Sequence, residues 1–217
     1  QSSAYRQRRA ATAAFNCSSP VIRRGIALTP VKFGIAFTTT FLNQAGALVH
    51  VYKDGSIHLN HGGTEMGQGL FIKVVQVVAN AFCVGVDRVK ITATNTSKVP
   101  NTSATAASSG TDLNAMAALD ACTTIKQRLV AFAAEKYAVD PAYIRFEHEK
   151  VTMGTVERTF AQLVMEAYLG RISLSSTGYY RTPKIHYDRT TASGRPFLYF
   201  AYGAAVSEVE IDTLTGE

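Results

Sequence analysis

The stretch "HLNHGGTEMGQGLFIKVVQ", residues 58–76, passes from a strand-like pattern through a run of glycines into a helical pattern. Four glycines lie between Gly62 and Gly69, and apolar residues then recur at helical spacing up to Cys83. A glycine turn that opens a helix lets a ligand approach the backbone, and the N–H groups of the helix start favour anionic or polar groups. We expect Glu65 and Gln68 at the mouth of such a site. A tight turn capped by the acid, without a ligand, is the alternative.

The residues on either side of this stretch predict a mixture of strands and helices. "ALVHVYKDGSIHLN", residues 47–60, alternates around Asp54-Gly55, which predicts a hairpin. We expect further strands in "RVKITAT", "ISLSSTGYYRT" and "PFLYFAYGAAVSEVEIDTLTGE", the last two joined by a polar loop around Ser193-Gly194, and a second hairpin in "YIRFEHEKVTM". Four helices are predicted: Ser3–Phe15 with Ser3 as its cap, 69–83 stopped by Gly85, 112–138, and one capped by Thr159 that runs to Tyr168. Strands and helices do not alternate regularly, so the predicted fold class is α+β.

Composition and charge restrict the classes of function. The chain has 217 residues, 47% of them hydrophobic, and no apolar run approaches the roughly 20 residues that span a bilayer. The net charge of +6 comes from seven basic residues that precede the first acid, Asp54; the remainder carries a net charge of −1. The sequence contains no base-reading motif, so nucleic acid is not an expected partner. Three scattered cysteines predict no disulfide framework, and a reducing cytoplasm fits them best.

A second loop candidate runs from Asn95 to Asp112 as "NTSKVPNTSATAASSGTD". It is long for an ordinary connection and consists almost entirely of small polar residues. Small residues let a cofactor approach the backbone, and their hydroxyl and N–H groups offer many polar contacts. The alternative is a flexible surface loop. Because the two loops flank one helix and one strand, we expect them to form a composite ligand site.

Other patterns favour plainer interpretations. "KFGIAFTTTFLNQAGA", residues 32–47, is typical of a half-buried strand, although Phe37-Thr38 could also offer a stacking ring and a hydroxyl to a flat heterocycle. His58 and His61 have HxxH spacing but no third ligand nearby, so no metal held by protein side chains is expected. No nucleophile motif is present.

Taken together, "KFGIAFT", "HGGTEMGQG", "VPNTSATAASSG" and the final strand resemble the molybdenum-binding region of the molybdenum hydroxylase family. The likeness covers essentially the whole chain, and Phe37-Thr38 with "TAAS" at 105–108 is more similar to the xanthine dehydrogenases of that family than to its aldehyde oxidases. We therefore expect residues 1–217 to be part of a molybdopterin-binding domain, with 1–31 as a basic N-terminal helix and linker and 32–217 as an α+β cofactor-binding region.

The resemblance implies roles for individual residues. Met66, Gly67 and Gln68 match one loop that contacts the molybdopterin cofactor, and Thr105, Ala107 and Ser108 match the second. Phe37 matches a ring that stacks on a purine, and Thr38 matches a hydroxyl that contacts it. No catalytic residue is expected in this chain, because the family's catalytic Glu lies in a segment that would follow Glu217. The pterin's own sulfurs hold the molybdenum, which agrees with the lack of protein metal ligands.

The resemblance also implies partners that lie outside the chain. We expect a purine substrate, the rest of a parent subunit, 2Fe-2S clusters and FAD in another domain or subunit, and a homo-oligomer, with no turnover by this piece alone. The alternatives are aldehyde oxidase or another N-heterocycle hydroxylase of the same family, or a non-catalytic binding module that retains the fold.

Overall fold

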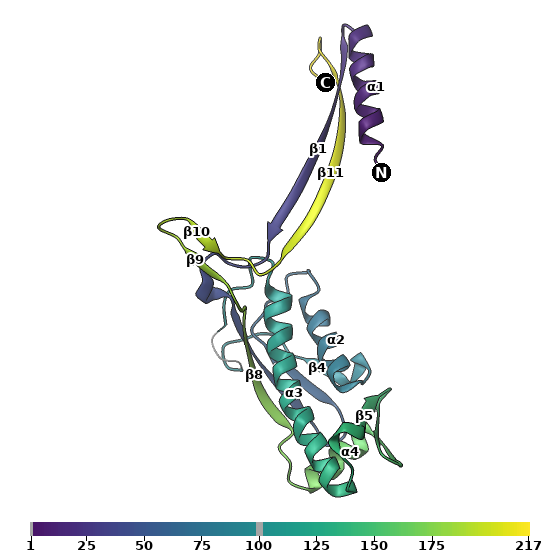
Figure 1. The fold of residues 1–217 in the computed structure, drawn as a ribbon, viewed down its shortest axis with the longest axis vertical. Helices are drawn as coiled ribbons and strands as arrows, with labels where there is room; N and C mark the ends of the chain where they lie inside the picture. Colours follow the sequence, from purple (N-terminus) through teal and green to yellow (C-terminus); the bar gives the residue numbers. More distant parts are fainter. Residues whose placement is uncertain (1, 99–101) are drawn as a thin grey trace. The chain divides into compact units, whose positions relative to one another are not determined.

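The computed structural model describes residues 2–98 and 102–217 (Figure 1). They divide into two compact units: the first combines the N-terminal segment up to Ile35 with Tyr199–Glu217, and the second is Ala36–Leu198. Helices and antiparallel strands predominate and do not alternate regularly, so the predicted α+β class is confirmed. No helix among the described residues is long and apolar enough to cross a membrane.

The first unit is a long two-stranded ribbon with one helix. Helix α1 (Tyr5–Ser18) packs against β1 (Ile22–Gly34), and β1 pairs antiparallel with β11 (Phe200–Asp212) along its whole length. Two expectations are wrong here. Ala4, in a left-handed conformation, caps α1 in place of Ser3, and the stretch expected to be a linker forms most of β1.

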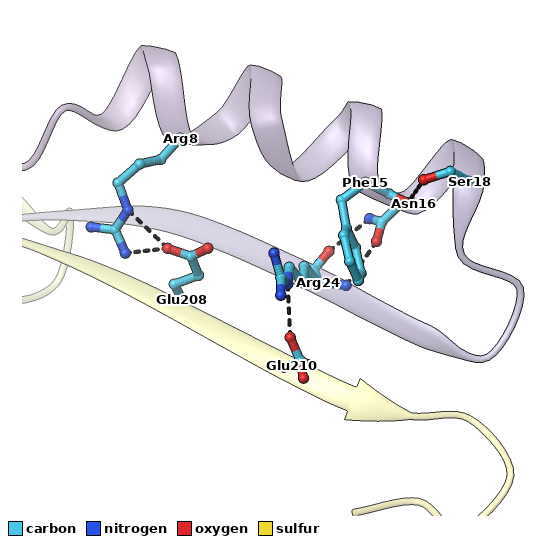
Figure 2. A network of polar contacts seen from close by, with 7 residues as sticks. All are labelled: Arg8, Phe15, Asn16, Ser18, Arg24, Glu208 and Glu210. Atoms are coloured by element: carbon cyan, nitrogen blue, oxygen red, sulfur yellow. Dashed lines mark hydrogen bonds and ion pairs between the residues drawn. The ribbon is translucent and has the colours of Figure 1, made fainter.

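The basic N-terminal segment pairs with acids of this same unit. Arg8 contacts Glu208, and Nε of Arg24 lies 2.7 Å from a carboxylate oxygen of Glu210 (Figure 2). The Arg24 guanidinium also lies 3.8 Å from the centre of the Phe15 ring. Exposed ion pairs of this kind contribute only about 0–1 kcal/mol each. The Arg8 pair joins α1 to β11, and the Arg24 pair joins β1 to β11.

The second unit is built on a four-stranded sheet. Its strands β4 (Val89–Ile91), β3 (Ile57–His61), β2 (Gln44–Val51) and β8 (Ser175–Arg181) lie in that order. β2 and β3 form the predicted hairpin, with Gly55 at φ 81° in its turn. β8 pairs antiparallel with β2, and β4 pairs parallel with β3. β3 is therefore an interior strand, and its last residue is followed directly by the glycine run.

Two helices cover this sheet: α2 (Leu70–Phe82) and α3 (Gly110–Tyr137). α3 lies very close to β8, because a Cβ on Gly178 would be only 2.0 Å from the carbonyl oxygen of Ala117. The helices predicted over 69–83 and 112–138 are therefore confirmed, with a correction to the end of the first. α2 ends at Phe82, where Cys83 turns left-handed with φ 58°, ahead of the expected stop at Gly85.

The rest of the second unit consists of short elements. Thr159 and Gln162 form the capping box of a helix, which confirms the predicted cap. The polar loop expected around Ser193-Gly194 is part of a small hairpin. The elements are η1 (Thr40–Leu42), η2 (Val86–Arg88), η3 (Pro141–Tyr143), the sheet of β5 (Ile144–Glu147), β6 (Lys150–Met153) and β7 (Val156–Thr159), α4 (Phe160–Leu169), β9 (His186–Asp188) and β10 (Ser193–Arg195).

Candidate functional site

The two loops singled out in the sequence meet at one cavity in the second unit. The backbone N–H of Thr64 donates to the hydroxyl of Thr105 over 2.8 Å, which ties the loops together. The cavity has a volume of roughly 460 Å³. Its lining comes from the starts of α2 and α3 and the loops before them: Met66, Gln68, Leu70, Lys73, Thr105, Ala106, Ala107, Ser108, Gly110 and Thr111. The two loops therefore line one cavity, as the sequence predicted.

Two adjacent glycines allow this close approach. A Cβ on Gly62 would lie 2.0 Å from Cγ2 of Thr102, a distance that no real contact shows. A Cβ on Gly63 would lie 2.6 Å from Leu70, the first residue of α2, and 2.7 Å from the amide nitrogen of Asn114 in α3. The second loop and the starts of both helices therefore pack directly on glycine backbone.

The N-terminus of α2 is closed by an acid of its own loop. One carboxylate oxygen of Glu65 accepts from the N–H groups of Gly67 (2.9 Å) and Gly69 (3.0 Å), and the other accepts from that of Phe71 (2.9 Å). The N–H of Phe71 is the main cause that lowers the pKa of Glu65 below its usual value, so the carboxyl is ionised at neutral pH. Glu65 therefore caps the start of α2.

The Gln68 side chain also stabilises this loop. Its amide nitrogen donates to the carbonyl of Thr64 (2.9 Å), and its amide oxygen accepts from the N–H of Met66 (2.6 Å). Lys73 donates from Nζ to the carbonyl of Gln68 over 2.9 Å, which brings a positive charge to the cavity wall. Each Gln68 group retains further hydrogen-bonding capacity for a ligand.

The N-terminus of α3 has the opposite character. Ala107 and Ser108, which precede it, both have left-handed backbones, with φ 55° and 57°. Within the described part of the chain, the N–H groups of Ala107, Ser108, Gly110 and Thr111 have no hydrogen-bond acceptor. Successive unpaired N–H groups at a helix start form a concave receptor for an anionic or polar group, and strained non-glycine residues concentrate at such sites.

Two buried polar side chains, His61 and Asn114, lie near the glycine turn. His61 is 2% exposed, and its Nδ1 accepts from the N–H of Gly63 over 3.0 Å. Burial lowers the pKa of His61 to about 4, so the imidazole is neutral at pH 7. Among the residues that the structure describes, its Nε2 and the amide oxygen of Asn114 lack hydrogen-bond partners. No group of three or more His, Cys, Asp or Glu that could hold a metal occurs among residues 2–98 and 102–217.

The sequence profile of the molybdopterin cofactor-binding domain matches residues 1–217. The chain belongs to this family. It is 48% identical over 216 residues to the xanthine dehydrogenase/oxidase of Mus musculus, covering 100% of this chain and 15% of that protein. It is 46% identical over 213 residues to the xanthine dehydrogenase of Oryza sativa subsp. japonica, covering 98% and 14% respectively. The chain thus spans about one seventh of the length of these relatives.

Solved structures share the fold of this molybdopterin cofactor-binding domain. Quinoline 2-oxidoreductase from Pseudomonas putida 86 matches 99% of this chain and 27% of its own, with a TM-score of 0.77 and 20% identity. Reconstituted CO dehydrogenase from Oligotropha carboxidovorans matches 97% and 27%, with a TM-score of 0.77 and 19% identity. At this level of identity the likeness establishes the fold.

The lining of the cavity fits molybdopterin, an anionic and polar group. The unpaired N–H groups at the start of α3 supply donors, Lys73 supplies positive charge, and Gln68 supplies an amide that can donate and accept. The volume falls within the range of about 300–1,000 Å³ that is usual for cofactor sites. A cofactor that carries its own sulfur ligands needs no cluster of metal-binding side chains in the protein.

Five of the six predicted cofactor residues line the cavity: Met66, Gln68, Thr105, Ala107 and Ser108. Gly67 does not, because its N–H turns to Glu65. The sequence analysis missed Leu70, Lys73, Ala106, Gly110 and Thr111. Lys73 carried a recognisable signal, since a cation in the first turn of a helix is electrostatically unfavourable unless a nearby group compensates it.

Phe37 and Thr38 do not line this cavity. The strand predicted over 32–47 is wrong, because β1 ends at Gly34 and the chain forms a turn before β2. Asn43, 2% exposed, holds that turn: its amide oxygen accepts from the N–H of Phe37 (2.8 Å), and its nitrogen donates to the Phe37 carbonyl (2.9 Å). The Phe37 ring is half-buried and Thr38 is exposed.

Proposed function

We propose that this chain forms one wall of the molybdopterin site in an enzyme of the xanthine dehydrogenase type, which hydroxylates purines. The observation that carries this proposal is the meeting of the two loops at a cavity where α3 presents unpaired N–H groups beside Lys73. The names of the relatives and their high identity support the enzyme class. Because the chain spans so little of their length, turnover belongs to the longer protein.

Within this proposal the chain binds and orients the cofactor. Ala107 and Ser108 donate backbone N–H groups, Gln68 and Thr105 add side-chain contacts, and Met66 with Gly67 shapes the edge of the loop. Gly110, Thr111 and Lys73 join them, since they lie around the same cavity. When bound, the molybdenum cofactor supplies the oxidation–reduction chemistry.

On the substrate side we propose that the Phe37 ring stacks on the purine and that the Thr38 hydroxyl contacts it. The hydrogen bonds of Asn43 to Phe37 support this role, because they fix the turn that presents both side chains. The catalytic Glu, the 2Fe-2S clusters and FAD belong to other parts of a longer, homo-oligomeric assembly. The three free cysteines support a reducing compartment such as the cytoplasm.

A matched pair of lysine variants in the full-length enzyme tests the cofactor site. Lys73 and Lys126 each donate to a backbone carbonyl, of Gln68 (2.9 Å) and Ala81 (2.8 Å) respectively, but only Lys73 lines this cavity. Lys73→Met should weaken cofactor retention roughly 10-fold or more, because a hydrogen bond to a charged group contributes about 1.5–3 kcal/mol. Lys126→Met should leave retention unchanged.

The measurement is molybdenum and pterin content per folded enzyme after dialysis, with melting temperature recorded in parallel. Preferential cofactor loss from Lys73→Met at an unchanged melting temperature supports the site. Equal cofactor content in both variants would remove Lys73 and this cavity from the proposal.

A further inference from the structure

The ribbon of the first unit has two outer edges that differ. Inside the described ranges, β1 and β11 pair only with each other, so each strand has one edge that faces away from its partner. In an antiparallel pair, alternate residues direct their N–H and C=O groups toward the partner strand, and the others direct theirs outward. The contacts of Arg24 and Asp212 identify the outward set.

Arg24 belongs to the outward set on β1. Its N–H donates to Oδ1 of Asn16 and its C=O accepts from Nδ2 of Asn16, both over 2.8 Å, so both backbone groups bond to α1 (Figure 2). Arg24 lies opposite Glu210, and Pro30, in the same alternating set, lies opposite Ala204. Proline has no N–H to offer at this outward position. The outer edge of β1 is therefore closed at Arg24 by Asn16 and lacks a donor at Pro30.

The outer edge of β11 has neither feature. The outward residues of the same set are Tyr202, Ala204, Val206, Glu208 and Glu210. Among the residues that the structure describes, their backbone N–H and C=O groups have no hydrogen-bond partner, and β11 contains no proline. A long unpaired edge of this kind is a template for another strand, and a two-stranded ribbon alone is only marginally stable.

A turn after β11 already directs the chain onto this edge. The N–H of Asp212 donates to the carbonyl of Glu217, and the N–H of Gly216 donates to the carbonyl of Asp212, both over 2.8 Å. Gly216 has φ 81°, and the Asp212 carboxylate accepts from the N–H of Leu214 over 2.8 Å. A three-residue loop followed by a left-handed glycine is a common hairpin connection, with the glycine as a bulge.

We propose that the outer edge of β11 takes a third, antiparallel strand, formed by the segment that follows Glu217 in the longer polypeptide. The relatives are long enough to supply it, since this chain covers only 15% of the mouse protein. The bonds between Asp212 and Glu217 set the register: the nth residue after Glu217 lies opposite the nth residue before Asp212. β11 thereby becomes a central strand, which connects this domain to the rest of its subunit.

Hydrogen exchange in the full-length protein, read at residue resolution by mass spectrometry, tests the edge. The inward amides of β11, such as those of Gly203 and Ala205, are protected by β1 in any case. The outward amides of Ala204, Val206 and Glu208 should be protected equally, with exchange slowed roughly 100-fold or more, as for amides in stable strands. Outward amides that exchange freely beside protected inward ones would overturn the proposal.

A cysteine pair tests the identity and register of the strand. The pair combines Ser207→Cys with a cysteine at the fifth residue after Glu217, a non-hydrogen-bonded position where opposing Cα atoms lie about 4.5 Å apart. It should form an intramolecular disulfide under mild oxidation. The control cysteine at the ninth residue, opposite Gly203, should not. A disulfide between two copies of the chain, or equal yields from both pairs, would show that another occupant or register holds the edge.

Discussion

Helices α2 and α3 begin at the same cavity, but their N-termini are in opposite states. At α2, the Glu65 carboxylate takes three backbone N–H groups and places a negative charge on the positive end of the helix. At α3, four N–H groups between Ala107 and Thr111 have no acceptor within the described residues, and two backbones are strained. The N–H groups at one helix start are already paired within the chain, and those at the other are available to a ligand.

The two helix N-termini therefore offer different groups to a ligand in the same cavity. At the start of α2, Glu65 would repel an anionic ligand and already occupies the N–H groups. The start of α3 also carries an acid, Asp112, but within the described residues four N–H groups there have no acceptor and can donate to such a ligand. We therefore propose that the glycine loop acts mainly as a rigid support and that the second loop acts as the receptor. A glycine run before a helix does not by itself show that the start of that helix binds an anion. That depends on whether a side chain already accepts from its N–H groups.

The largest effect is expected where both helix starts depend on one residue. Gly63→Ala would place a Cβ 2.6 Å from Cδ2 of Leu70 and 2.7 Å from the amide nitrogen of Asn114, so these two buried side chains, one from each helix, must both move. We expect a loss of about 2–3 kcal/mol in the free energy of unfolding, measured by urea denaturation, since overpacking costs about 1–3 kcal/mol. Cofactor content should fall with it.

Gly110→Ala is the matched control at the same cavity. Its Cβ would meet Thr105 at 3.4 Å, an ordinary contact, and alanine favours the helix by up to about 1 kcal/mol over glycine. This variant should be as stable as the parent or more so. If both variants lower the free energy of unfolding by the same amount, then the two helix starts do not pack together on Gly63.

Variants of Ala107 test whether the backbone strain at the start of α3 can be changed without removing its N–H donors. With φ 55°, Ala107→Gly should relieve strain and raise the free energy of unfolding by roughly 1 kcal/mol, whereas Ala107→Val should lower it by about 1–2 kcal/mol. Both variants keep the backbone N–H, so molybdenum content per folded protein should change little. Opposite shifts in urea midpoint would confirm the strain; shifts of the same sign would contradict it.

Much of this fold could be predicted because its signals are local. The Asp54-Gly55 hairpin, the period of α2 and the Thr159 cap each depend on residues close together in the sequence. β1 was missed because its pairing partner, β11, lies at the other end of the chain and its own pattern includes Pro30 and two adjacent arginines. The ends of α1 and α2 were missed because Ala4 and Cys83 adopt left-handed backbones that non-glycine residues rarely take.

The site was predictable to a similar degree. Composition identified both loops, the glycine turn already predicted Gln68 at the mouth of the site, and the resemblance added Ser108. The hydrogen bond from Thr64 to Thr105 that joins the loops is long-range and leaves no local pattern. The role of Glu65 stayed open, because a carboxylate at a helix start can either cap that helix or face a ligand, and only the positions of the N–H groups distinguish the two.

The smallest effect is expected at Glu65, because its side chain is only partly buried and water competes for its partners. Glu65→Gln keeps the shape but removes the charge, so the start of α2 should loosen slightly while cofactor content stays near that of the parent. The lowered pKa of Glu65 means that its contribution is fully present above its usual value of 4.5 and is lost as the pH falls through the lower value of the folded state. The stability difference between Glu65→Gln and the parent, followed by urea denaturation, should therefore shrink below pH 4.5.

Asp54→Asn is the control. Asp54 is exposed, and its pKa is lowered mainly by the Ser56 hydroxyl, but it lies at the hairpin turn away from the cavity lining. Asp54→Asn should show the same pH dependence of stability, with no change in cofactor content. If Glu65→Gln lost more cofactor than Lys73→Met, then α2 would be the receptor and the contrast between the two helix starts would be reversed.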